Sequence, residues 1–247
     1  MLKILANKLL RPLAITLVSD WESPKTKTAE MSYSQRHLHW LKELGVTVCI
    51  DIGANAGQYG RQLIGLGYVG KIVSFEPLSV AFSQLEDAIK SYKKWTAQNL
   101  AISDIDGQLE INIAGNSQSS SLLQMKKRHR DAEPQSAYTD RELVAVAKLS
   151  TIWNRITEPA DLVWIKIDTQ GSERMVLNGL GRIPNQVVAV EVELSFSDLY
   201  DGQPSVPEMT QYLMDEGFEM VALEEVFREP VSHRTLQVNG IFLRRCD

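Results

Sequence analysis

Two kinds of hydrophobic segment alternate along most of the chain. Short runs rich in β-branched residues, among them Val46–Asp51, Lys71–Glu76 and Asp161–Asp168, predict buried strands. Segments such as Ser79–Tyr92 carry apolar residues at three- and four-residue spacing, which predicts amphipathic helices. This alternation predicts an α/β fold with a mainly parallel sheet and helices on both of its faces.

The same reasoning divides the rest of the chain. Further strands are expected at 96–103, 108–113, 186–194, 218–223 and 235–245, and helices at 34–44, 172–180 and 206–217. No periodic pattern covers residues 115–140, so we expect a structureless loop there, and such long loops are typically lids or binding loops. One domain is predicted at 46–247, preceded by a helical extension at 1–45.

The first 18 residues form a basic and partly apolar segment. Lys3, Lys8 and Arg11 precede any acidic residue, and Pro12 interrupts the apolar run. The run is far shorter than the ~20 residues that span a bilayer, and no cleavage site of a signal peptide is evident. We interpret the segment as a helix that covers the fold, with peripheral membrane contact through residues 1–18 as the alternative.

Composition narrows the function classes. The chain has 247 residues, 44% of them hydrophobic, and a formal charge of −5 at pH 7, which is typical of a globular protein. An acidic chain argues against a nucleic-acid partner, because such partners require a basic surface. Cys49 and Cys246 form no CxxC pair, which argues against a metal or redox role and favours a reducing cytoplasm.

A glycine-bearing turn follows the first predicted strand, in the segment VCIDIGANAGQYG. Gly53 lets the backbone turn sharply, and Gly57 permits close approach of a ligand or of the next helix. The nicotinamide fingerprint G-x-G-x-x-G fails, because its second glycine position holds Asn55. With Asp51 before it, the turn resembles the first motif of class I methyltransferases, which bind S-adenosylmethionine through groups that include acceptors for its ammonium.

Acids at the ends of the next two strands extend this site. Glu76 follows Gly57 by 19 residues, and an acid about 20 residues beyond such a turn binds a ribose diol in these folds. Dinucleotides and S-adenosylmethionine both carry that ribose, so Glu76 does not separate them. Asp104 follows the third strand, where class I methyltransferases commonly place a polar residue at the adenine amino group, but Asp104 is equally a turn former.

Ionisable residues also mark the later strands. Lys166 and Asp168 share one face of a buried strand, where charges are costly unless paired or used. Three functional roles are open for Asp168: orienting the donor, holding the acceptor hydroxyl, or acting as the base, and we expect the base. An internal Lys–Asp ion pair is the structural alternative. His233, in a polar loop, is the second candidate base.

Two further groups of charges are less informative. Glu191 and Glu193 share one strand face, but no third ligand accompanies them, so no metal site is predicted. The basic run Lys126–Arg130 is interpreted as a solvated face, with contact to an acidic substrate such as a sugar phosphate as the alternative.

Seven segments in order resemble the FkbM-type methyltransferases. They are VCIDIGANAGQYG, IVSFEP, NLAISDIDGQLEI, SQSSSLL, LVWIKIDTQGSERMVLNGL, VVAVEVELSFSDLYDGQ and LQVNGIFLRR. The resemblance covers about residues 46–244 and implies a class I methyltransferase (Rossmann-like) fold with a mainly parallel seven-stranded sheet. It implies methyl transfer from S-adenosylmethionine to a hydroxyl of a sugar, glycan or natural product.

The resemblance also assigns residues. The expected donor contacts are Asp51, Gly53, Asn55, Gly57, Tyr59, Glu76 and Asp104. Asp168 and Lys166 are expected at the reacting end. One departure is Asn239, where we expect an acid in the last strand. Two alternatives stay open: a nicotinamide-dependent oxidoreductase on a Rossmann-like fold, and a non-catalytic S-adenosylmethionine-binding protein.

Overall fold

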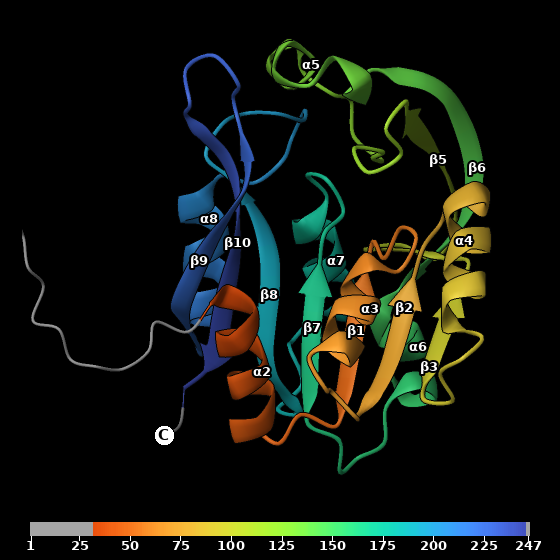
Figure 1. The fold of residues 1–247 in the computed structure, drawn as a ribbon, viewed down its shortest axis with the longest axis vertical. Coiled ribbons are helices and arrows are strands. Elements are labelled where there is room, and N and C mark those ends of the chain that lie inside the picture. The colour runs from red at the N-terminus through yellow and green to blue at the C-terminus, as the bar shows by residue number, and fades with distance from the viewer. Residues whose placement is uncertain (1–31, 246–247) are drawn as a thin grey trace, which may run out of the picture. The chain divides into compact units, whose positions relative to one another are not determined.

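A central seven-stranded sheet organises the protein, whose computed structural model describes residues 32–245 (Figure 1). Its strands are β1 (Val48–Ile52), β2 (Lys71–Phe75), β3 (Trp95–Gln98), β7 (Val163–Ile167), β8 (Val187–Ser195), β9 (Phe218–Arg228) and β10 (Thr235–Arg244). They lie in the order β3-β2-β1-β7-β8-β10-β9. The pairs from β3 to β8 are parallel, and β10 is antiparallel to both β8 and β9. The predicted class I methyltransferase fold is confirmed.

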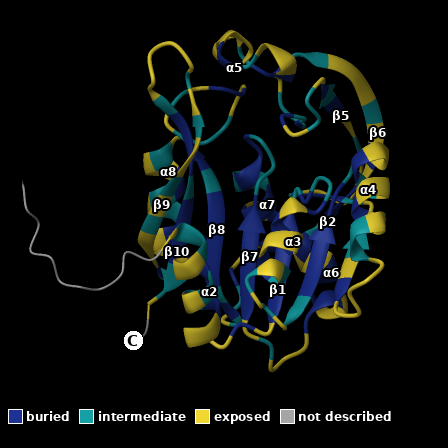
Figure 2. Cartoon of the chain, in the orientation of Figure 1, coloured by how far each residue is buried: buried dark blue, intermediate teal, exposed yellow. Residues whose placement is uncertain are grey.

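Helices cover both faces of this sheet. One face carries α2 (Tyr33–Glu43), α3 (Gln58–Gly65) and α4 (Ser79–Ile89), and the other carries α6 (Leu149–Ile156), α7 (Glu173–Leu180) and α8 (Val206–Asp215) (Figure 1). The central strands are therefore buried along their length, while the outer faces of the helices are exposed (Figure 2). The central strands β1 and β7 send alternate residues into two hydrophobic clusters, one on each face, as the period of two requires.

The single strand predicted at 96–103 is in fact two short strands that belong to two different sheets. The chain leaves the main sheet after β3, and β4 (Ala101–Ser103) joins β6 (Tyr138–Lys148) and β5 (Gly107–Ala114) in the order β4-β6-β5. Asn99 fixes the break, because its Nδ2 donates to the backbone oxygens of Glu76 (3.0 Å) and Pro77 (2.8 Å). The prediction of one continuous strand was wrong for this reason.

The prediction of a structureless loop at 115–140 was also wrong. This stretch contains α5 (Lys127–Ala132), a 3₁₀ helix (Pro134–Ser136) and the start of β6. Met125 and Ala132 pack with Leu199, Tyr200 and Leu236 in a separate hydrophobic cluster. In Figure 1, α5 lies beyond the upper ends of β7 and β8, which are their carboxyl ends. We call residues 116–136 the roof segment.

The N-terminal part of the described chain packs on the domain. The compact unit begins at Tyr33, and His37 and Leu41 of α2 are buried, although the sequence grouped this helix with the extension. The division at residues 45 and 46 stays a prediction. The possible membrane segment at 1–18 lies outside the described residues. Within residues 32–245, no helix is long and apolar enough to cross a membrane.

Candidate active site

Three charged side chains form a row across adjacent strands. Asp51 of β1 is in register with Lys166 of β7, which is in register with Glu191 of β8. All three are buried, on the sheet face that α2 and α3 cover. The row places one cation between two carboxylates, and this pairing offsets the cost of removing each charge from water.

Lys166 also reaches the end of its own strand. Its Nζ donates to Asp168 Oδ2 at 3.0 Å and lies 5.2 Å from the centre of the Tyr59 ring. Burial alone would lower the pKa of Lys166, but the charges of Asp168, Asp51 and Glu191 raise this pKa above its usual value. Lys166 is therefore a cation at neutral pH. The Lys–Asp ion pair that the sequence offered as an alternative exists, and it lines a cavity.

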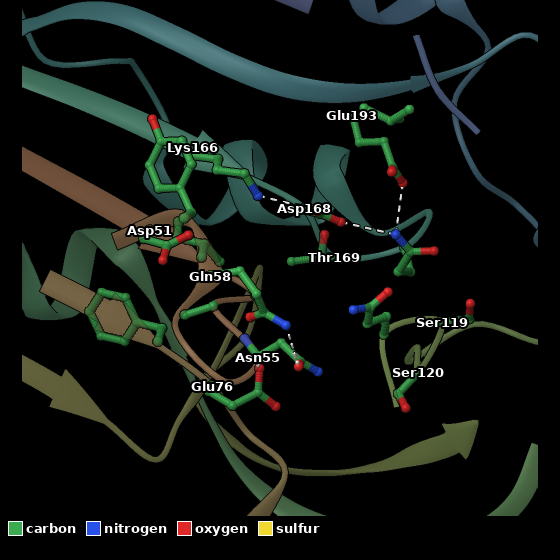
Figure 3. A pocket seen from close by; sticks show the side chains of 18 of the residues that line it. Asp51, Asn55, Gln58, Glu76, Ser119, Ser120, Lys166, Asp168, Thr169 and Glu193 are labelled. Carbon is green, nitrogen blue, oxygen red and sulfur yellow. Dashed lines mark hydrogen bonds and ion pairs between the residues drawn. The ribbon is translucent and has the colours of Figure 1, made fainter. Parts of the chain in front are cut away.

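Asp168 and Glu193 form a second polar row, because each follows a member of the first row, Lys166 or Glu191, by two positions. Gln170 Nε2 donates to Asp168 Oδ1 and to Glu193 Oε2, both at 2.9 Å (Figure 3). Gln170 itself has a positive φ of 55°, and its Oε1 accepts from Tyr200 Oη at 2.8 Å. Burial, and then the charge of Asp168, raise the pKa of Glu193 well above its usual range. The carboxylates of Asp168 and Glu193 thus lie side by side and share one amide group of Gln170.

The cavity between the sheet and the roof segment has a volume of about 470 Å³, which is within the usual range for small-molecule sites. Strand ends supply most of the predicted residues. Its described lining includes Asp51, Gly53, Asn55, Tyr59, Glu76, Lys166, Asp168, Glu191, Glu193 and Asn239. The sheet therefore brings seven of the ten predicted catalytic and donor-binding residues to one cavity, together with both acids of β8.

Asp51 offers an unused acceptor at the β1 side of the cavity. Its Oδ2 accepts from Ser74 Oγ at 3.2 Å, whereas its Oδ1 is buried without a hydrogen-bond partner. Burial raises the pKa of Asp51 to about 6, and Lys166 opposes this rise. A buried carboxylate oxygen without a donor fits the ammonium group of S-adenosylmethionine, because a charge-assisted bond would remove the penalty of leaving that oxygen unsatisfied.

The turn after β1 is shaped by backbone constraints. Gly53 has a φ of +83°, and a Cβ there would lie 1.8 Å from the carbonyl oxygen of Asp168. Asn55 has a φ of 46°, and its backbone N–H donates to Glu76 Oε2 at 2.8 Å. The backbone N–H of Leu78 donates to Glu76 Oε1 at 2.9 Å. Both oxygens of Glu76 are thus fixed in the cavity wall, and each keeps a lone pair for a ribose hydroxyl.

Tyr59 holds the row rather than offering its hydroxyl to a ligand. Its Oη donates to Glu191 Oε2 at 2.9 Å and lies 3.0 Å from His37 Nε2, while Tyr33 Oη donates to Glu191 Oε1 at 3.1 Å. Glu191 is therefore fully engaged by neighbouring side chains. Among the described residues, no group of three or more His, Cys, Asp or Glu is placed to hold a metal ion.

Three predicted residues lie outside the cavity lining. Gly57 packs against α4 and β3, since a Cβ there would lie 2.9 Å from Leu85 and 3.1 Å from Trp95. Its predicted contact with the donor stays a prediction. Asp104 follows β4 in the small sheet and is displaced with it. His233 is exposed in the β9–β10 turn and is not part of the cavity lining, so its role as a base stays a prediction.

Sequence reasoning missed two contributors. His129 was assigned to a solvated run, but it is buried and lines the cavity. Its helical spacing from the buried residues Met125 and Ala132 was the available signal. Gln170 was missed because nothing in the sequence marks a glutamine as the bridge between two acids. The roof segment is tied to the same turn, since Ser121 Oγ donates to the Gln170 carbonyl oxygen at 2.7 Å.

Comparison with known proteins identifies the family of this chain. The methyltransferase FkbM domain matches residues 51–220, more than half of the chain. Comparison with curated proteins gave no match. Similar solved structures include a methyltransferase FkbM from Methylobacillus flagellatus (14% identity, TM-score 0.47). The alignment covers 79% of this chain and 43% of that protein. This chain thus corresponds to less than half of that protein.

Two other solved structures resemble the chain to a similar degree. One is a putative RNA methyltransferase from Pyrococcus horikoshii (14% identity, 86% of this chain and 83% of the other, TM-score 0.44). The other is the 1,6-didemethyltoxoflavin-N1-methyltransferase of Burkholderia thailandensis, with S-adenosylhomocysteine bound (10% identity, 86% and 78%, TM-score 0.43). Likenesses of this size carry no functional argument.

The domain match therefore decides between the open alternatives. It begins at Asp51 and includes the β1 turn, Glu76, Asp168 and both acids of β8, and a nicotinamide-dependent oxidoreductase does not fit it. The chain belongs to the FkbM methyltransferase family and is an S-adenosylmethionine-dependent methyltransferase.

Proposed function

We propose that the protein transfers the methyl group of S-adenosylmethionine to a hydroxyl oxygen of a sugar, glycan or natural-product acceptor. The observation that carries this proposal is the pair Asp168 and Glu193, bridged by Gln170 at the strand ends. A hydroxyl is a weak nucleophile, and a nearby base contributes typically about 10²–10⁴-fold to such a transfer. Carboxylates converging on the reacting end supply that base.

The residues have separate roles in this proposal. Asp51 holds the ammonium of the donor and Glu76 holds the ribose, while the donor, when bound, supplies an electrophilic methyl carbon. Asp168 orients the acceptor hydroxyl and takes its proton as the oxygen bonds to that carbon. Lys166 keeps Asp168 in place through the 3.0 Å ion pair, and Glu193 is the second candidate base. Positioning of both reactants supplies up to ~7–11 kcal/mol of the barrier.

The donor and the chemistry are tested separately. Calorimetric titration with S-adenosylhomocysteine, beside NADH, measures donor binding, and we expect the first ligand alone to bind. Methyl transfer is then measured with isotopically labelled S-adenosylmethionine and a panel of sugars, glycans and hydroxylated natural products. Binding without transfer to any hydroxyl in the panel would count against the proposed hydroxyl acceptor.

Substitution of the acid separates its role from donor binding. We expect Asp168→Asn to lower turnover by about 10²-fold or more and to change the affinity for S-adenosylhomocysteine little. Asp131→Asn is the matched control, because Asp131 is an exposed aspartate paired with Lys127 at 2.5 Å and lies outside the cavity lining. Undiminished turnover in Asp168→Asn would remove Asp168 from the mechanism.

A further inference from the structure

The order of the strands separates two sides of the cavity. The donor contacts lie on β1 and β2, whereas Asp168, Glu193 and Asn239 come from β7, β8 and β10 on the other side of β1. Figure 3 shows Ser119 and Ser120 of the roof segment on the side of the cavity away from Asp51. An acceptor that reaches Asp168 therefore lies against the roof segment.

His129 is the unusual residue of that segment. Its side chain lines the cavity and is only 2% exposed, yet its Nδ1 has no hydrogen-bond partner. The ring contacts Tyr200 and Phe227, with centroids 5.1 Å and 5.3 Å away. Burial lowers the pKa of His129 to about 4, so the ring is neutral at pH 7 and offers one donor and one acceptor.

Nothing in the cluster around His129 explains a polar ring at this position. The two rings that it contacts, Tyr200 and Phe227, are aromatic, and a buried nitrogen without a partner costs free energy on folding. A leucine or phenylalanine would fill the same space without that cost. The position is therefore better explained by a ligand than by the stability of the roof.

The charges around the cavity limit what that ligand is. Seven carboxylates line it: Asp51, Glu76, Glu133, Asp168, Glu191, Glu193 and Glu224. Among the described lining residues, Lys166 is the one lysine or arginine, and it is already paired with Asp168. Of the run Lys126–Arg130, only His129 lines the cavity, and Lys126 pairs with Asp198 and Asp201. An anionic ligand would therefore lie among acidic side chains, with no unpaired lysine or arginine among the described lining residues to bind it.

We propose that His129 is a binding residue of an acceptor subsite that takes an uncharged hydroxylated ring and discriminates against its phosphate. A hydroxyl both donates and accepts, which matches the neutral imidazole and the serine and amide groups of the roof segment. Phe227, which also lines the cavity, offers an apolar surface for the ring's C–H face. This inference rests on the proposed function and specifies its acceptor.

The test uses the full chain saturated with S-adenosylhomocysteine. Methyl α-D-glucopyranoside, methyl α-D-mannopyranoside and methyl α-L-rhamnopyranoside are titrated by NMR beside glucose 6-phosphate. We expect at least one neutral hexoside to bind, with the phosphate at least tenfold weaker. His129→Phe keeps the packing and removes the hydrogen bond, so we expect it to weaken hexoside binding about three- to tenfold. His129→Gln should restore part of this loss.

Controls separate this inference from the proposed function. His39→Gln changes an exposed histidine of α2 and should leave hexoside binding unchanged. All variants should bind S-adenosylhomocysteine like the wild type, which also shows that they fold. Failure of the wild type to bind S-adenosylhomocysteine would refute the proposed function. If it binds, then tighter binding of the phosphate, no binding of any hexoside, or an unaffected His129→Phe would overturn this inference alone.

Discussion

Replacing Lys166 by methionine tests whether the buried charges act as one unit. At 3.0 Å, the Lys166–Asp168 pair interacts with about 5.5 kcal/mol in an effective dielectric of ~20. The side chain of Asp168 is 30% exposed and that of Lys166 is 9% exposed, so water screens part of this energy. Removing one partner of a buried pair typically costs ~3–5 kcal/mol, and we expect about 3 kcal/mol at pH 8.

The loss should shrink as the pH falls. Burial raises the pKa of Asp51 to about 6, and Lys166 opposes that rise, so its removal raises the pKa further. An acid whose pKa is raised on folding takes up a proton on folding, and its contribution to stability is lost as the pH rises through that pKa. At pH 5 Asp51 is protonated in the variant, which reduces the loss by about 1.4 kcal/mol for each added pKa unit.

Urea unfolding of Lys166→Met at pH 5 and pH 8 measures both values. Lys90→Met is the matched control, because Lys90 pairs with Asp87 at 2.5 Å on the open surface, and it should behave like the wild type at both pH values. An equal loss at pH 5 and pH 8 would refute the coupling between Lys166 and Asp51. A loss at pH 8 no larger than that of the control would refute the role of the ion pair in stability.

Two further predictions concern the donor side. Gly53→Ala should unfold the protein or destabilise it by more than about 3 kcal/mol, because its Cβ would lie 1.8 Å from the Asp168 carbonyl oxygen. Gly67→Ala is the control, because Gly67 also has a positive φ (+90°) but has open space around it. In urea unfolding, this control should lose only ~1–2 kcal/mol of stability. Calorimetry should show S-adenosylhomocysteine binding more tightly as the pH rises from 5 to 8, because Asp51 and Glu76, with pKa values of about 6 and about 7, become charged; a flat profile would contradict their contact with the donor.

The parts of the site that the sequence revealed depend on local rules. Residues two apart in a strand share a face, so the pairs Lys166 with Asp168 and Glu191 with Glu193 could be placed together from spacing alone. The glycine turn and Glu76 were readable for a similar reason, since each directly follows a strand. These elements account for the confirmed sheet and for most of the cavity wall.

The parts that the sequence concealed depend on contacts between distant segments. Register between strands places Asp51 beside Lys166, and no spacing within either strand encodes this. The roof segment has regular structure because Met125 forms a bridge to Tyr200, 75 residues later. Without that partner, its serine-rich and basic composition indicates a loop. His129 was concealed by the same composition.

The departure at Asn239 has a physical reason in the sheet. Asn239 of β10 is in register with Glu193 of β8 and with Glu224 of β9. An acid at this position would stand directly between two carboxylates, and like charges opposite one another destabilise a sheet. Burial already raises the pKa of both neighbours, so a third carboxylate would raise the cost of ionising them. With Asn239 at this position, Glu193 lines the cavity at the same level of the sheet without a third carboxylate opposite it.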